Sequence, residues 1–79
     1  MAKTIRALLV GCGGITSTWI KALQGLKNVE LVGFVDLMES AAATRAKEWG
    51  RGEPLVTSDL NEALEVLHPD VVFNCTIPA

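Results

Sequence analysis

Residues 7–16 read Ala7-Leu8-Leu9-Val10-Gly11-Cys12-Gly13-Gly14-Ile15-Thr16, an apolar segment joined to a glycine turn that opens a helix. The apolar residues predict the end of a strand buried on both faces, as in parallel sheets. Gly11 permits a tight turn and Gly13 lets the backbone approach a bulky anion, because neither has a Cβ atom. A helix that begins near Gly14 then directs its unpaired N–H groups and positive dipole end at that anion. The stretch therefore predicts a pyrophosphate-binding turn.

A second apolar segment, 29–35, is followed directly by Asp36. This acid lies 20 positions after Thr16 (36 − 16), the third position of the glycine motif. A dinucleotide site needs a carboxylate there to accept a hydrogen bond from a ribose hydroxyl. The order strand, glycine turn, helix, strand and acid favours such a site over the alternative that the glycines serve only close packing.

The third motif position usually holds Gly or Ala, which allow close helix-to-strand packing, and here it holds Thr16. Its extra atoms either push the first helix off the sheet or supply a hydroxyl to a phosphate. The residues leave both alternatives open.

The expected cofactor is NAD rather than NADP. Asp36 repels a 2′-phosphate, and the next two residues, Leu37 and Met38, offer neither a cation nor a hydroxyl to hold one.

The composition predicts one small globular domain in 79 residues, with 49% hydrophobic residues and a net charge of −2. That charge provides no basic field for nucleic acid or an anionic membrane. The apolar run after the N-terminus is too short for a secretory signal or a membrane span. Cys12 and Cys75 match no metal-binding spacing, so we expect no metal site and two reduced thiols in a cytoplasmic protein, without a disulfide.

Strands are expected at 4–10, 29–36, 55–57 and 70–76, and helices at about 14–25, 39–50 and 60–67. Asp59 and Glu62 have the spacing of a capping box at the start of the third helix, and proline after His68 ends it. The first helix carries an apolar stripe that places Trp19 in the core. Arg45 is expected to be solvated, and so is the lone His68.

This order predicts an α/β fold, a partial Rossmann-like doubly wound parallel sheet with spatial strand order 3-2-1-4. The first and fourth strands are then neighbours, and their C-terminal ends flank the point where ligands bind. Residues 11–14 and 74–78 therefore share one crevice.

Four segments together resemble the N-terminal half of the glucose-fructose oxidoreductase and inositol dehydrogenase family. They are Val10-Gly11-Cys12-Gly13-Gly14-Ile15, Val35-Asp36, Ser58-Asp59-Leu60 and Pro69-Asp70-Val71-Val72-Phe73-Asn74-Cys75-Thr76-Ile77-Pro78. The resemblance covers essentially the whole chain, and its more specific part is the spacing to Thr-x-Pro at the end of the fourth strand. It implies an oxidoreductase that uses NAD or NADP on a sugar, polyol or related compound.

The resemblance also implies which residues hold the cofactor. The glycine turn would hold the pyrophosphate, Asp36 the adenosine ribose, and Thr76 and Pro78 would lie along the cofactor. The complete set of expected cofactor-binding residues is Gly11, Cys12, Gly13, Gly14, Ile15, Asp36, Leu37, Thr76 and Pro78.

The family's catalytic lysine, in a Glu-Lys-Pro motif, and its substrate domain are absent from residues 1–79. We therefore expect the N-terminal part of an NAD(P)-binding domain that is not catalytic alone and that forms a homo-oligomer through the edge of its fourth strand. Two other interpretations stay open. One is a non-enzymatic nucleotide-binding or redox-sensing module, and the other is a fragment that only associates through its edge.

Overall fold

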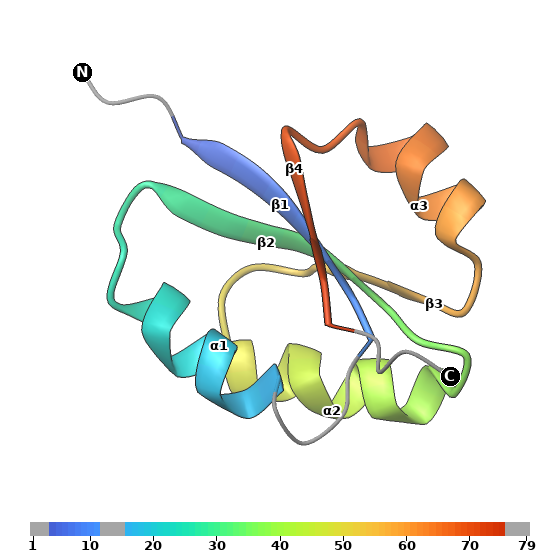
Figure 1. Cartoon of the computed structure of the whole chain (residues 1–79), viewed down its shortest axis with the longest axis horizontal. Helices are drawn as coiled ribbons and strands as arrows, with labels where there is room; N and C mark the ends of the chain where they lie inside the picture. Colours follow the sequence, from blue (N-terminus) through green and yellow to red (C-terminus); the bar gives the residue numbers. More distant parts are fainter. Residues whose placement is uncertain (1–3, 12–15, 76–79) are drawn as a thin grey trace.

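The computed structural model describes residues 4–11 and 16–75. Strands and helices alternate along these residues, and the strands pair in parallel in the order β3-β2-β1-β4 (Figure 1). The predicted Rossmann-like α/β fold and strand order are confirmed. The elements are β1 (Ile5–Val10), α1 (Thr16–Gln24), β2 (Val29–Val35), α2 (Glu39–Trp49), β3 (Leu55–Thr57), α3 (Leu60–Leu67) and β4 (Val71–Asn74).

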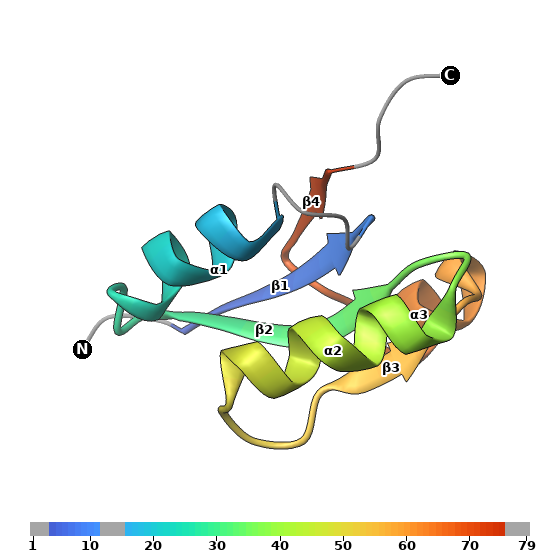
Figure 2. The same ribbon diagram turned by 90° about the horizontal axis from the view of Figure 1, so that it is seen from below.

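Helices cover both faces of the sheet. Figures 1 and 2 show α1 and α2 side by side on one face and α3 on the other. Because consecutive strands are parallel, each connection must cross a face of the sheet, and a helix provides that crossing.

The larger core lies between the sheet and the α1–α2 layer. Its biggest members, Phe34 and Trp49, are almost completely buried. Burial of such a side chain contributes about 1.5–3 kcal/mol, so this layer supplies most of the hydrophobic stabilisation. The buried residues are Ala7, Leu9, Ile20, Leu23, Leu31, Phe34, Ala42 and Trp49.

The smaller core lies under α3 and depends on Gly33. A Cβ atom at this position would lie 2.5 Å from Leu67 Cδ1 and 2.8 Å from Leu8 Cδ1. The register also shifts here, because Ala7 is opposite Leu31 whereas Leu8 is opposite Gly33, leaving Val32 as an extra residue in β2. The bulge puts Gly33 on the face that α3 approaches.

The prediction that Trp19 belongs to the core is wrong, because its side chain is 45% exposed. The buried face of α1 is formed by Ile20 and Leu23 instead. Trp19 lies on the flank of that face, where its ring stacks on Phe73 of β4 with centroids 6.0 Å apart. An apolar side chain at helical spacing can thus cover the edge of a sheet instead of its centre.

Local backbone and side-chain bonds set the ends of α2 and α3, and those of α3 follow the predicted signals. Gly50 ends α2 in the left-handed region at φ 66°, and its N–H donates to the carbonyl oxygen of Ala46. Asp59 caps α3 by accepting from the N–H of Glu62 at 3.2 Å. The return bond of a capping box is replaced, because the N–H of Asp59 donates to Thr57 Oγ1 at 3.0 Å. His68 is exposed at the C-terminal cap, as predicted.

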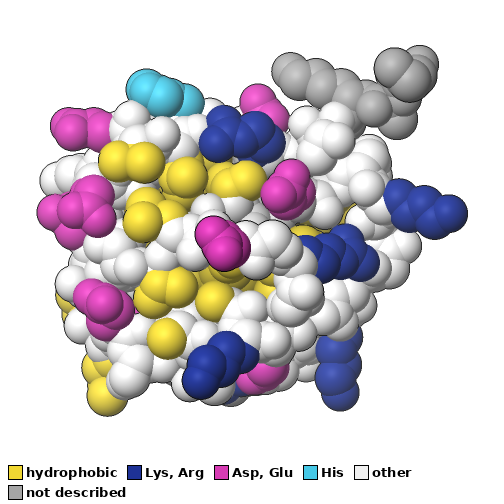
Figure 3. All heavy atoms as spheres, turned by 180° about the vertical axis from the view of Figure 1, so that it is seen from behind, with side chains coloured by type: hydrophobic (Ala, Val, Ile, Leu, Met, Phe, Trp, Pro, Cys, Tyr) yellow, Lys and Arg dark blue, Asp and Glu magenta, His cyan; other side chains and the backbone are white. Residues whose placement is uncertain are grey.

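The surface mixes charges of both signs. Figure 3 shows, on the face opposite the view of Figure 1, lysine and arginine side chains interspersed with acidic ones and with small apolar areas. In residues 4–11 and 16–75, no helix has the length and apolar character needed to cross a membrane.

β4 stands at the end of the strand order in the described part of the chain, beside β1. It carries no charged side chain, and Val71 and Val72 are 39% and 45% exposed. Edge strands that avoid self-association usually carry charges, prolines or bulges, and β4 has none of these.

We therefore expect the 79-residue polypeptide to self-associate, with β4 pairing antiparallel to its copy about a two-fold axis. Val72→Lys places a charge on this edge and should shift the sedimentation profile towards monomer. Val66→Lys, on an exposed position of α3, is the matched control. A monomeric wild type at high concentration contradicts this expectation.

Candidate functional site

The C-terminal ends of β1, β2 and β4 lie together at one edge of the sheet. This edge is the one where the strands end, and it differs from the side of the sheet that β4 forms. Val10 is opposite Val35 on one side and Asn74 on the other. The ladder continues past β4, since the N–H of Cys75 donates to the carbonyl oxygen of Val10 at 2.7 Å. In open parallel sheets this edge is where ligands bind.

Gly11 makes the turn at the end of β1. Its φ is 85°, a left-handed value that side chains disfavour, and its N–H donates to the carbonyl oxygen of Val35 at 2.8 Å. The residue is buried. The sequence-based argument that glycine is needed for a tight turn here is therefore supported by the backbone itself.

The first turn of α1 lies beyond this glycine, with Thr16 as its first residue. This turn has no acidic side chain of its own, and the Glu48 carboxylate that lies 3.3 Å from Ser17 Oγ is paired with Arg45. A helix N-terminus of this kind favours an anion such as a phosphate group.

Asp36 is held at the end of β2. Its N–H donates to the carbonyl oxygen of Thr57 at 3.3 Å, and its Oδ1 accepts from the N–H of Met38 at 2.8 Å. The second bond closes a turn that leads directly into α2. The half-buried carboxylate is thus fixed at the same edge as Gly11, beside Leu37, which is 94% exposed.

Three of the predicted cofactor-binding residues are described, and all three lie at this edge: Gly11, Asp36 and Leu37. The others, Cys12, Gly13, Gly14, Ile15, Thr76 and Pro78, lie outside the described residues. The expected absence of a disulfide involves Cys12 and stays a prediction. Its counterpart Cys75 is half-buried and packs against the larger core.

Sequence reasoning missed a polar network that joins the first turn of α1 to α2. Arg45 donates to Ser17 Oγ at 2.9 Å and pairs with Glu48, so the prediction that Arg45 is solvated surface is wrong. Position on the helix suggested a solvated cation, and no local pattern relates Arg45 to a serine 28 residues earlier.

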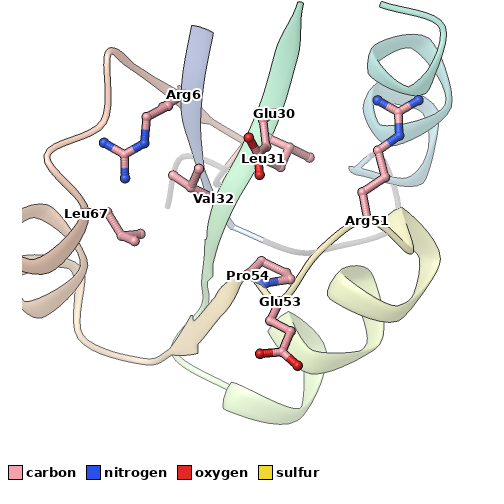
Figure 4. Close-up of a pocket in the computed structure, with 8 residues that line it drawn as sticks. All are labelled: Arg6, Glu30, Leu31, Val32, Arg51, Glu53, Pro54 and Leu67. Atoms are coloured by element: carbon pink, nitrogen blue, oxygen red, sulfur yellow. The ribbon is translucent and has the colours of Figure 1, made fainter. Parts of the chain in front are cut away.

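A cavity of about 300 Å³ lies at the opposite edge of the sheet, near the start of β1 (Figure 4). Its charged side chains do not converge. Arg6 donates to the carbonyl oxygen of His68 at 3.3 Å, whereas Arg51 lies over the Trp49 ring at 4.6 Å and donates to the carbonyl oxygen of Gln24. Because the two guanidinium groups are bonded to different parts of the protein, they do not form a common anion site. This cavity is therefore the weaker candidate for a ligand site. No group of three potential metal ligands occurs in residues 4–11 and 16–75.

No family model matches the chain, and no curated protein does. Among solved structures it is similar to the crystal structure of GenD2 from gentamicin A biosynthesis in complex with NAD, with a TM-score of 0.86 and 26% sequence identity. The match covers 100% of this chain and 22% of that one, so the chain spans about a fifth of the GenD2 chain. The Rossmann-like fold is therefore shared with a protein crystallised with NAD.

Gly11→Ala tests the strain at the turn. Alanine at φ 85° should lower the free energy of unfolding by about 1–2 kcal/mol, measured by urea denaturation. Gly25→Ala is the control, because its φ is not positive and its added Cβ would meet only Ala22 O at 3.5 Å. Equal stability of Gly11→Ala and wild type would show that the turn tolerates a side chain.

Proposed function

We propose that this chain is the dinucleotide-binding part of an NAD-dependent oxidoreductase. The observation that carries the proposal is the placement of Gly11, which leads towards the N-terminal end of α1, and of Asp36, which leads into α2, on one edge of the sheet. The similarity to an NAD-bound structure over the full chain supports it.

In this proposal the pyrophosphate lies over the turn 11–15 and accepts hydrogen bonds from backbone N–H groups at the start of α1. The Asp36 carboxylate accepts from a hydroxyl of the adenosine ribose. Leu37, almost fully exposed, offers the adenine ring an apolar surface. By the family resemblance, Thr76 and Pro78 would lie along the cofactor.

NAD supplies hydride chemistry when bound, and the residues of this chain bind and orient it. The single histidine of the sequence, His68, lies at the opposite edge, where its carbonyl oxygen accepts from Arg6 at the start of β1. By the family resemblance, the group that moves a proton on the substrate is the lysine of a Glu-Lys-Pro motif, and residues 1–79 contain no such motif. By the family resemblance, the substrate is a sugar, polyol or related compound. The cytoplasmic location, inferred from the reduced cysteines, and the homo-oligomer, inferred from the β4 edge, stay predictions.

A second candidate function is a nucleotide-binding or redox-sensing module without catalysis, because a fold alone does not fix function. A Glu-Lys-Pro motif downstream in the parent gene favours the oxidoreductase. Its absence, together with NAD binding, favours the module.

Cofactor preference tests the proposed site. We expect wild type to bind NAD at least about tenfold more tightly than NADP, because Asp36 repels a 2′-phosphate. The double variant Asp36→Ser, Leu37→Arg should reverse or abolish that preference, measured by calorimetric titration with both cofactors.

The matched control is Glu39→Ser, which removes a nearby carboxylate from the first turn of α2. It should leave the preference unchanged. Equal affinities of wild type for the two cofactors would contradict the role of Asp36, and absence of binding to either would contradict the proposed function.

A further inference from the structure

A hydrogen-bonded network fastens the first turn of α1 to α2. Arg45 Nη1 donates to Ser17 Oγ at 2.9 Å, and the Ser17 hydroxyl lies 3.3 Å from Glu48 Oε2. The Arg45 guanidinium also pairs with the Glu48 carboxylate, and its side chain is only 19% exposed.

This network reaches one half of the proposed cofactor site, and the α2 helix connects it to the other half. Ser17 belongs to the turn whose N–H groups face the pyrophosphate, one residue after Thr16. At the other end of α2, the Asp36 carboxylate is bonded to the N–H of Met38, the N-cap residue of the helix. A continuous set of contacts therefore runs from Asp36 through α2 and Arg45 to the first turn of α1.

We propose that Arg45 is a positioning residue that sets the separation between the ribose-binding carboxylate and the phosphate-binding helix end. The inference rests on the proposed function. The strand register places the two subsites side by side, and the contact between Arg45 and Ser17 adds a second constraint by holding the first turn of α1 against the rigid α2 helix.

The core holds α1 and α2 at points away from this first turn. Trp49 anchors α2, and the first buried core side chain of the described part of α1 is Ile20. The far end of α1 is tied separately, because Gln24 Nε2 donates to the carbonyl oxygens of Glu48 and Trp49 at 2.8 and 3.2 Å. Loss of the Arg45 contact therefore loosens the first turn of α1, while the core and Gln24 still hold the rest of the helix.

Arg45→Met and Glu48→Met each break the network, and each should weaken NAD binding by about two- to fivefold. Adenosine occupies only the ribose side, so its affinity, measured by NMR titration, should stay at the wild-type value. A merely destabilised protein would lose affinity for both ligands.

The variant Glu48→Met distinguishes a positioning role of Arg45 from attraction of the phosphate by the positive charge of Arg45. If Arg45 acted only by attracting phosphate, removal of the neighbouring carboxylate would tighten NAD binding, and that result would overturn the proposal. Arg45→Lys keeps the charge and one donor, and should restore part of the lost affinity.

Lys47→Met is the matched control, because it removes an exposed cation from the same helix. NAD affinity of Arg45→Met equal to that of Lys47→Met, with wild type binding NAD, would overturn this inference alone. Failure of wild type to bind NAD would overturn the proposed function as well. Circular dichroism identifies a variant that does not fold, and Glu48→Met then provides the test.

Discussion

The parallel pairing of β1 with both β2 and β4 is the interaction on which the structure depends. It aligns Val10 with Val35 and with Asn74, so that three strands end together. The residues that follow β1 and β2 therefore lie at the same edge. Gly11 follows β1 in a left-handed turn, and Asp36 follows β2 in a turn that its side chain closes by bonding to Met38. The same pairing requires crossover helices, and it places the N-terminal end of α1 at that edge. Thus the site is a consequence of strand register more than of contacts between its own side chains.

Local signals predicted the elements well because each signal acts within a few residues. Gly50 ends α2 through its own backbone conformation, and Asp59 begins α3 through a bond three residues away. The motif order of strand, glycine turn, helix, strand and acid, with its 20-residue spacing, predicts that Gly11 and Asp36 serve one site. This placement of the site was predictable even though the two residues are far apart in the sequence.

The errors concern choices that depend on tertiary partners. Trp19 has the spacing of a core residue, yet the orientation of α1 on the sheet puts Ile20 inward and leaves Trp19 over Phe73. Arg45 has the position of a solvated cation, yet Ser17 provides a partner that no sequence window contains. The bulge at Val32, for which the sequence offers no signal, also depends on a tertiary partner. It lies next to Gly33, which has no Cβ atom and therefore leaves room for Leu67 of α3. Periodicity reports the apolar side of a helix but not its rotation against a particular sheet.

NAD is proposed to bind at the edge formed by the ends of β1 and β2. Titration of the ¹⁵N-labelled chain with NAD, followed by amide chemical shifts, measures where it binds. The largest changes are expected at Gly11, at Thr16 and Ser17, and from Asp36 to Met38. Changes centred instead on Arg6, Glu30 and Arg51, around the cavity at the opposite edge, or no changes at saturating NAD, would contradict it.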